Sequence, residues 1–176
     1  MSAFTLFSTA FTVFLGTATL GFSASIPHDF RVVAHFGSGY IPLLPDDPAN
    51  GKIGAWYVRL DGRGVGKIEV FRNSPGKKTK SSVRYSPSEL SRIVDTVRTS
   101  RFFQLPRFMD AGVTDTANYS LEVTMDGKTH RVRVASPRAL RDKSQLNRFI
   151  AVWIAVCQKM PSQLDDGATG DLRQSS

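Results

Sequence analysis

The sequence is poor in cysteine, and this shortage limits the class of protein it can encode. Cys157 is the only cysteine among 176 residues, so no disulfide can form within the chain. A domain without disulfides needs a substantial apolar core, and about 150 residues are enough to bury roughly 68–70% of their unfolded surface. The composition therefore favours one domain with an ordinary hydrophobic core over a small disulfide-stabilised scaffold.

Charge is missing from the N-terminal end of the chain, where Asp29 is the first charged side chain. Residues 4–22 are mostly apolar and are followed by small residues, and Ser23 and Ser25 suit cleavage by a signal peptidase. We therefore expect residues 1–25 to be an export signal and the protein to be periplasmic or secreted. Two alternatives stay open: an uncleaved membrane anchor, because the stretch nearly spans a bilayer of about 30 Å, and a buried core element.

Recognisable catalytic and metal-binding motifs are absent from the sequence. No serine lies in a Gly-x-Ser-x-Gly turn, and the three histidines have no metal-ligand spacing. His130 falls on the inner face of a predicted hairpin, where we expect a sheet-edge histidine or a core histidine with its hydrogen bonds satisfied, rather than a catalytic base. His35 is the one histidine beside a long loop, residues 37–52, which also carries Asp46 and Asp47. We expect no enzyme, metal or cofactor; a secreted hydrolase or metal-dependent enzyme using His35 with these aspartates remains the alternative.

Basic residues outnumber acidic ones, with 23 Lys and Arg against 15 Asp and Glu, a net charge of +8. A chain with this surplus attracts polyanions such as anionic lipid headgroups and acidic glycans. Solvated surfaces that keep the protein soluble are the simpler interpretation. The densest basic segments give the candidate binding residues Lys77, Lys78, Lys80, Arg84, Arg131 and Arg133.

These observations predict an exported, monomeric, non-enzymatic domain that binds an anionic envelope component or a protein. Nucleic acid is a poor candidate for the partner, because export removes the protein from it and no nucleic-acid-binding motif is present. Contact with a membrane is expected only if the N-terminal segment is retained. Inhibition of another exported enzyme, through the loop at residues 37–52, is a further alternative.

Hydrophobic periodicity predicts the secondary structure of most of the remaining chain. Residues 30–36 and 55–60 have strand composition, and Asp61-Gly62 marks a hairpin turn. In the returning strand the alternation of apolar residues shifts by one position around Gly66, which predicts a β-bulge there. Ser86 and Glu89 have the spacing of a capping box that opens a helix ending near Ser100. A second helix is expected over residues 143–159 from its apolar stripe.

The hairpin over residues 118–135 is the best-specified element. A two-residue Asp126-Gly127 turn places Val123 opposite His130, and it also places Leu121 opposite Val132 on the same face. The predicted fold is α+β, an antiparallel sheet built from two hairpins with two helices packed on one face. Residues 30–161 form this single domain, and residues 162–176 are expected to be a disordered tail.

Several of these segments together resemble a family of small exported bacterial proteins classed as domains of unknown function. The resemblance covers residues 56–160 and implies export, but it assigns no functional residue, because the family has no assigned activity. It is carried by the segments Ser86-Pro87-Ser88-Glu89-Leu90, Phe102-Phe103-Gln104-Leu105-Pro106, Thr114-Asp115 and the strand at residues 119–125 with Asp126-Gly127-Lys128.

Overall fold

The computed structural model describes residues 25–39, 46, 51–73, 78–113, 116–161, 164 and 172. The predicted signal at residues 1–25 therefore lies outside the described residues, apart from Ser25. Within the described part the chain forms strands, two α-helices and two short 3₁₀ helices: β1 (Arg31–Gly37), β2 (Ile53–Asp61), β3 (Val65–Arg72), β4 (Lys78–Arg84), α1 (Pro87–Thr99), η1 (Phe102–Gln104), β5 (Phe108–Met109), β6 (Asn118–Met125), β7 (Lys128–Ala135), η2 (Pro137–Ala139) and α2 (Lys143–Cys157).

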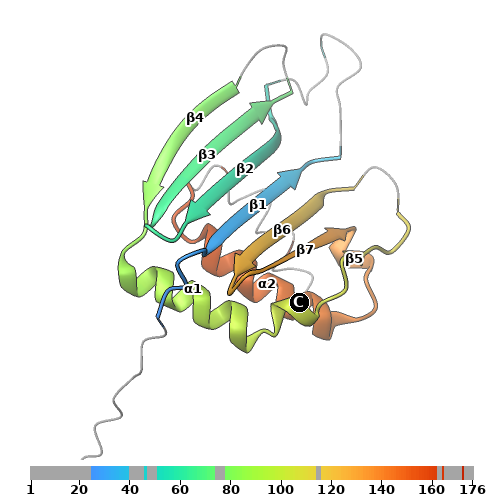
Figure 1. Ribbon diagram of the computed structural model, residues 1–176. Helices are drawn as coiled ribbons and strands as arrows, with labels where there is room; N and C mark the ends of the chain where they lie inside the picture. The colour runs from blue at the N-terminus through green and yellow to red at the C-terminus, as the bar shows by residue number, and fades with distance from the viewer. Residues whose placement is uncertain are drawn as a thin grey trace, which may run out of the picture.

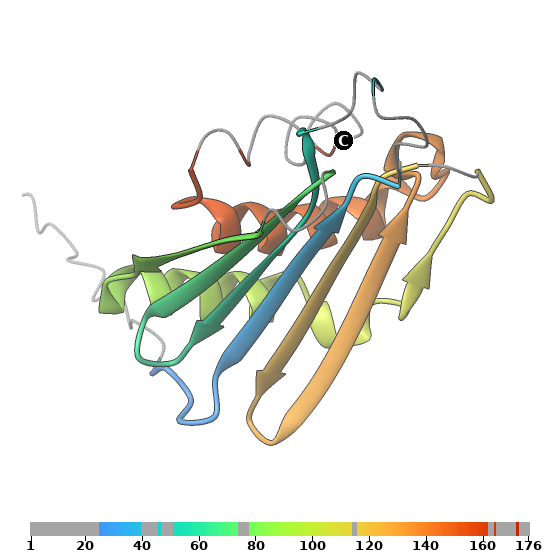
Figure 2. The same cartoon turned by 90° about the horizontal axis from the view of Figure 1, so that it is seen from above.

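One seven-stranded sheet in the order β4-β3-β2-β1-β6-β7-β5 organises the domain. Neighbouring strands are antiparallel except β5 and β7, which are parallel. Both helices lie on the same side of the sheet and leave its other face open (Figures 1 and 2). The predicted α+β class is confirmed.

The sheet is nevertheless larger than the two predicted hairpins. β1 joins the hairpins by pairing with β2 on one side and β6 on the other. β4 adds an outer strand that is exposed at every position except the partly buried Val83. Because a half-buried strand is recognised by alternating apolar residues, the polar sequence of β4 carried no such signal.

The β6–β7 hairpin has the predicted register. Val123 pairs with His130, and Glu122 pairs with Arg131 on the opposite face. Asp126 and Gly127 both have positive φ, at 53° and 72°, which suits a two-residue turn between twisted strands. The Asp29 carboxylate accepts hydrogen bonds from the backbone N–H groups of both turn residues, at 3.1 and 2.7 Å.

The prediction of a β-bulge at Gly66 is wrong. Gly66 pairs with Leu60 in an unbroken register, and the only shift between β2 and β3 falls between Ile53 and Ala55. The connection is a three-residue loop, residues 62–64, rather than a two-residue turn. Because of this longer loop, Val65 lies on the open face and Gly66 lies on the face toward the helices. The break in the apolar alternation between Val65 and Ile68 therefore comes from the loop and not from a bulge.

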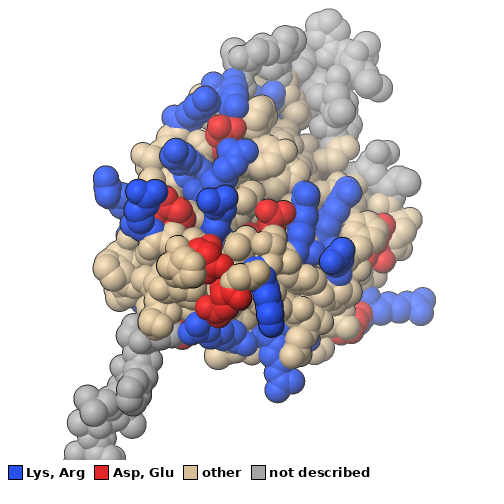
Figure 3. All heavy atoms as spheres, viewed as in Figure 1, with Lys and Arg blue, Asp and Glu red and all other residues tan. Residues whose placement is uncertain are grey.

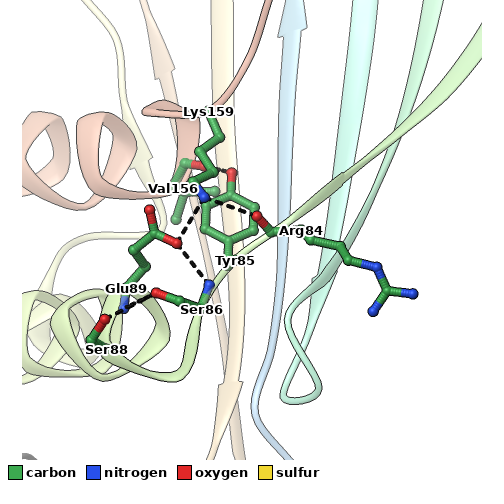
Figure 4. Close-up of polar contacts among 7 residues, drawn as sticks. All are labelled: Arg84, Tyr85, Ser86, Ser88, Glu89, Val156 and Lys159. Carbon is green, nitrogen blue, oxygen red and sulfur yellow. Dashed lines mark hydrogen bonds and ion pairs between the residues drawn. The ribbon is translucent and has the colours of Figure 1, made fainter.

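Helix α1 begins with the predicted capping box and ends at Thr99, with Ser100 as its C-cap. The Ser86 side chain accepts from the N–H of Glu89, and the Glu89 carboxylate accepts from the N–H of Ser86 at 2.7 Å. Figure 4 shows that Lys159, just beyond α2, completes this junction. Its ammonium group lies 2.9 Å from Glu89 and donates to the Arg84 carbonyl oxygen at 3.0 Å, which links β4, α1 and the end of α2.

The core lies between the helices and the covered face of the sheet. Trp56, Tyr119 and Trp153 are almost fully buried there, with the Trp153 ring centroid 5.2 Å from that of Trp56 and 5.4 Å from that of Tyr119. Two residues of the expected disordered tail are described, Leu164 and Leu172, and both are buried in the same core cluster. For the rest of residues 162–176 disorder stays a prediction.

Candidate functional site

The open face of the sheet carries side chains from alternate positions of every strand. The buried positions of the central strands point toward the helices, so their neighbours in sequence point the other way. Lys and Arg outnumber acidic residues on this open face: by register it carries Arg31, Arg59, Lys67, Lys78, Lys80, Arg84, Arg131 and Arg133, with Asp61, Glu69 and Glu122. Figure 3 shows basic side chains spread over the strand side of the molecule, with acidic ones among them.

Strand pairing aligns the central side chains of this face in one row that crosses the whole sheet. The row contains basic, aromatic and hydroxyl groups, and His35 lies at its centre on β1. In spatial order it reads Lys80, Glu69, Tyr57, His35, Ser120, Arg133 and Phe108. The two predicted basic segments, at residues 77–84 and 131–133, therefore lie toward opposite ends of one row.

His35 is held between an aromatic ring and two cations. Its imidazole stacks on Tyr57 with ring centroids 4.3 Å apart, and Tyr57 also contacts Phe71 edge-on at 5.8 Å. Burial lowers the pKa of His35 below its usual value, and the nearby Arg131 and Arg133 lower it further. At neutral pH His35 is therefore uncharged and presents one donor and one acceptor nitrogen.

A pocket of about 270 Å³ opens beside His35 on this face. The Arg133 guanidinium is oriented by a hydrogen bond to the Asn118 side-chain oxygen at 2.9 Å. Among the described residues, no carboxylate lines the pocket, whose walls are His35, Gly37, Asn118, Tyr119, Ser120, Arg131 and Arg133. The arrangement offers positive charge and hydrogen-bond donors to a negatively charged group.

The basic residues at the β4 end are partly neutralised by Glu69. Lys78 lies 2.9 Å from the Glu69 carboxylate and Arg59 lies 3.6 Å from it. The hydrogen bond from Lys78 lowers the pKa of Glu69, which keeps the carboxylate ionised. This end of the row is therefore less electropositive than the end formed by Arg131 and Arg133.

The structure brings His35 together with Arg131 and Arg133 in one pocket, and Asp46 is not among the residues that line it. Asp46 is exposed in a turn, and Asp47 and Lys77 lie outside the described residues. Within the described ranges no group of three His, Cys, Asp or Glu side chains is placed to hold a metal ion. The predicted alternative, a hydrolase using His35 with these aspartates, would need their carboxylates beside the imidazole, and the described walls of the pocket contain two arginines and the Ser120 hydroxyl but no carboxylate.

The remaining titratable candidates have structural roles. His130 faces the helices, its Nε2 lies 2.9 Å from the Leu105 carbonyl oxygen, and the Phe102 and Phe103 rings flank it. Cys157 is buried on α2. His130 is partly buried and has the hydrogen-bond partner expected of a sheet-edge or core histidine.

Sequence reasoning missed Tyr57, Asn118 and Ser120, which surround His35. Each lies at an outward position of a strand, where alternation alone marks it as partly exposed. Their proximity to His35 depends on β1 pairing with both β2 and β6, and no local pattern encodes that pairing.

Comparison with known proteins adds no function. The sequence matches no protein-family model, and no curated protein is significantly similar to it. The resemblance to exported proteins of unknown function therefore stays an expectation. Of the helices in the described residues, none is both long enough and apolar enough to cross a membrane.

Proposed function

We propose that this protein is an exported, non-enzymatic domain whose open sheet face binds an anionic ligand. One observation carries the proposal: basic segments some fifty residues apart in sequence lie on the same face of the sheet. Guanidinium and ammonium groups on one surface raise the local concentration of anions and bind them through charge-assisted hydrogen bonds. The uncharged N-terminal stretch supports export, which makes an envelope polyanion the partner class.

Aromatic groups between the cations support the same function. Arg59 lies 5.6 Å from the centroid of the Tyr57 ring, and Lys78 lies 4.9 Å from that of Phe71. Such contacts hold long cationic side chains against the sheet, so less conformational entropy is lost when an anion binds.

Retention on heparin and on anionic vesicles, measured against salt concentration, tests the proposal. The variants Lys78→Gln/Lys80→Gln and Arg131→Gln/Arg133→Gln each remove two charges from the open face, and both are expected to elute at lower salt than the wild type. Each lost ionic contact should reduce the slope of log affinity against log salt by about one unit or less. The Arg131/Arg133 pair should have the larger effect, because Glu69 already partly neutralises the β4 end.

Arg92→Gln/Arg141→Gln is the matched control. Both arginines are exposed, one on α1 and one just before α2, so this variant has the same net charge but an intact sheet face. It should elute close to the wild type. Equal loss of retention in all three double variants would mean that net charge, rather than the open face, causes binding. Retention that added salt does not weaken would also contradict the proposal.

A further inference from the structure

The pocket beside His35 is chemically distinct from the rest of the basic face. Toward the β4 end a carboxylate lies between cations, as Glu69 does between Arg59 and Lys78. Here Arg131 and Arg133 line a hollow whose described walls contain no carboxylate. Neutral polar side chains share its walls, since Ser120 and Asn118 also line it, and Asn118 accepts a hydrogen bond from Arg133. Convergent guanidinium and neutral donors suit an oxyanion, whose oxygens accept several hydrogen bonds at once.

The size of the pocket limits the ligand group that it can hold. Its volume of about 270 Å³ lies just below the range of about 300–1,000 Å³ typical of sites that enclose drug-sized molecules. Gly37 contributes to this space, because a Cβ atom there would stand 3.7 Å from His35 Cε1. The pocket therefore suits one small charged group with bridging water, not an extended molecule.

We propose that this pocket seats a single tetrahedral oxyanion, the phosphomonoester or sulfate group of a larger ligand, and that His35 takes up a proton when the anion binds. The inference rests on the proposed function and adds to it the chemical class of the group that is recognised. Arg131 and Arg133 supply the positive charge, and Asn118 holds Arg133 in place.

Proton uptake follows from the charges around His35. In the free protein, burial and the two arginines disfavour the imidazolium form and lower the pKa of His35. A bound anion offsets the charge of Arg131 and Arg133, so the imidazolium becomes favourable and donates to the anion. The other titratable or charged groups facing this region are Tyr57 and Arg59 from β2, Glu122 from β6 and Arg31 on β1 itself.

The thermodynamic linkage between proton uptake and anion binding sets the size and sign of the change in anion affinity with pH. A group that gains a proton on binding makes binding tighter as pH falls, by up to about tenfold per pH unit for one proton. The effect is largest between the pKa of His35 in the free protein and its higher pKa in the complex. Reciprocally, the anion raises the pKa of His35.

Sulfate is the probe of choice for the full chain, because its own charge does not change between about pH 5 and pH 8. Calorimetry should show sulfate binding that strengthens several-fold per pH unit on acidification. The ring protons of His35, followed by NMR, should titrate at higher pH with sulfate present. His35→Gln keeps a polar side chain and should remove the pH dependence, whereas Glu122→Gln should retain it.

Two further variants distinguish binding in the pocket from attraction by diffuse surface charge. Arg131→Gln/Arg133→Gln should abolish measurable sulfate binding. Gly37→Ala changes no charge but adds a methyl group in contact with His35, and it should weaken sulfate binding several-fold with little effect on heparin retention. Sulfate affinity that is independent of pH, or unchanged in the arginine variant, would overturn the proposal.

The source of the group is tested in two arms, with soluble glycerol phosphate and with phosphatidylcholine vesicles containing phosphatidic acid. Binding in either arm that requires His35 and the arginines supports a phosphomonoester site, and failure in both arms overturns it. Heparin retention separates this inference from the proposed function. If the protein is retained on heparin but binds neither sulfate nor phosphomonoesters, only the proposed oxyanion site is wrong. If the Lys78/Lys80 and Arg131/Arg133 variants are also retained on heparin like the wild type, both proposals are wrong.

Discussion

The charge state of single side chains in this domain depends on one or two charged neighbours, as His35 and Glu89 show. His35 is kept neutral by burial and two arginines, whereas Glu89 is kept ionised by the cation of Lys159. Glu89 also accepts the N–H of Ser86 at the start of α1, so the same carboxylate caps a helix and joins it to α2 (Figure 4). Such a residue contributes to stability only while it carries its charge.

We predict that Glu89→Gln lowers stability at neutral pH and that this loss disappears in acid. The hydrogen bond from Lys159, followed by that from Ser86, lowers the pKa of Glu89 from 4.5 to about 2 in the folded protein. A carboxylate with a lowered folded-state pKa stabilises the protein above its unfolded pKa, and this contribution is lost as pH falls toward 2. Urea midpoints of the two proteins should therefore differ at pH 7 and converge between about pH 4.5 and pH 2.

Lys159→Gln is the companion variant, because it breaks the same contact from the other side. The double variant should be less destabilised than the sum of the two single variants, since both remove one interaction. Strict additivity, or a difference between wild type and Glu89→Gln that stays constant down to pH 2, would show that the Glu89–Lys159 contact does not stabilise the protein.

At the scale of elements, β6 and β7 depend on a turn that only certain residues can make. Gly127 has φ of +72°, and Asp29 accepts hydrogen bonds from the N–H groups of both turn residues. This turn sets the register that places Ser120 opposite Arg133 on the open face. The shape of the pocket beside His35 therefore depends on the hairpin turn at the other end of β6 and β7.

Gly127→Ala is expected to lower the free energy of unfolding by about 1–2 kcal/mol, the cost of a left-handed conformation for a residue with a Cβ. A Cβ there would meet no atom within 4 Å, so the loss is conformational rather than steric. Gly127→Asn, which tolerates this conformation better, should lose less. Equal urea stability of the alanine variant and wild type would contradict this account of the turn.

At the scale of the whole molecule, the core includes residues from beyond the last helix. Leu164 is 6% exposed and Leu172 is fully buried, and both belong to the cluster that contains Trp56 and Trp153. The apolar surface that these two leucines bury is part of the domain core. The position of two leucines within a polar segment gave no periodic signal for this packing.

Leu172→Ala should therefore lower the free energy of unfolding by about 2–5 kcal/mol, the usual cost of truncating a fully buried leucine. Urea unfolding measures the change. Arg92→Ala, an exposed substitution on α1, should change stability by no more than about 0.5 kcal/mol. A Leu172→Ala protein as stable as the wild type would show that Leu172 does not contribute to the core.

The sequence by itself determined what depends on neighbours along the chain. The capping box of Ser86 and Glu89, the apolar stripe of α2 and the register set by Asp126-Gly127 all act over a few residues, so local pattern predicted them. β4 was not predicted because almost none of its side chains are buried. A strand with two exposed faces has no alternation of apolar and polar residues.

The candidate site depends on contacts between strands that are far apart in the sequence. His35, Arg131 and Arg133 were candidates from their positions in the sequence, but their meeting depends on the pairing of β1 with β6, whose hairpin partner β7 carries the two arginines. That pairing is chosen by the burial of side chains across the whole sheet, a long-range competition that no short segment encodes. The sequence therefore determined that the protein is basic and α+β, while the fold decided which of its charges share one face and which pair of arginines lies beside a neutral histidine.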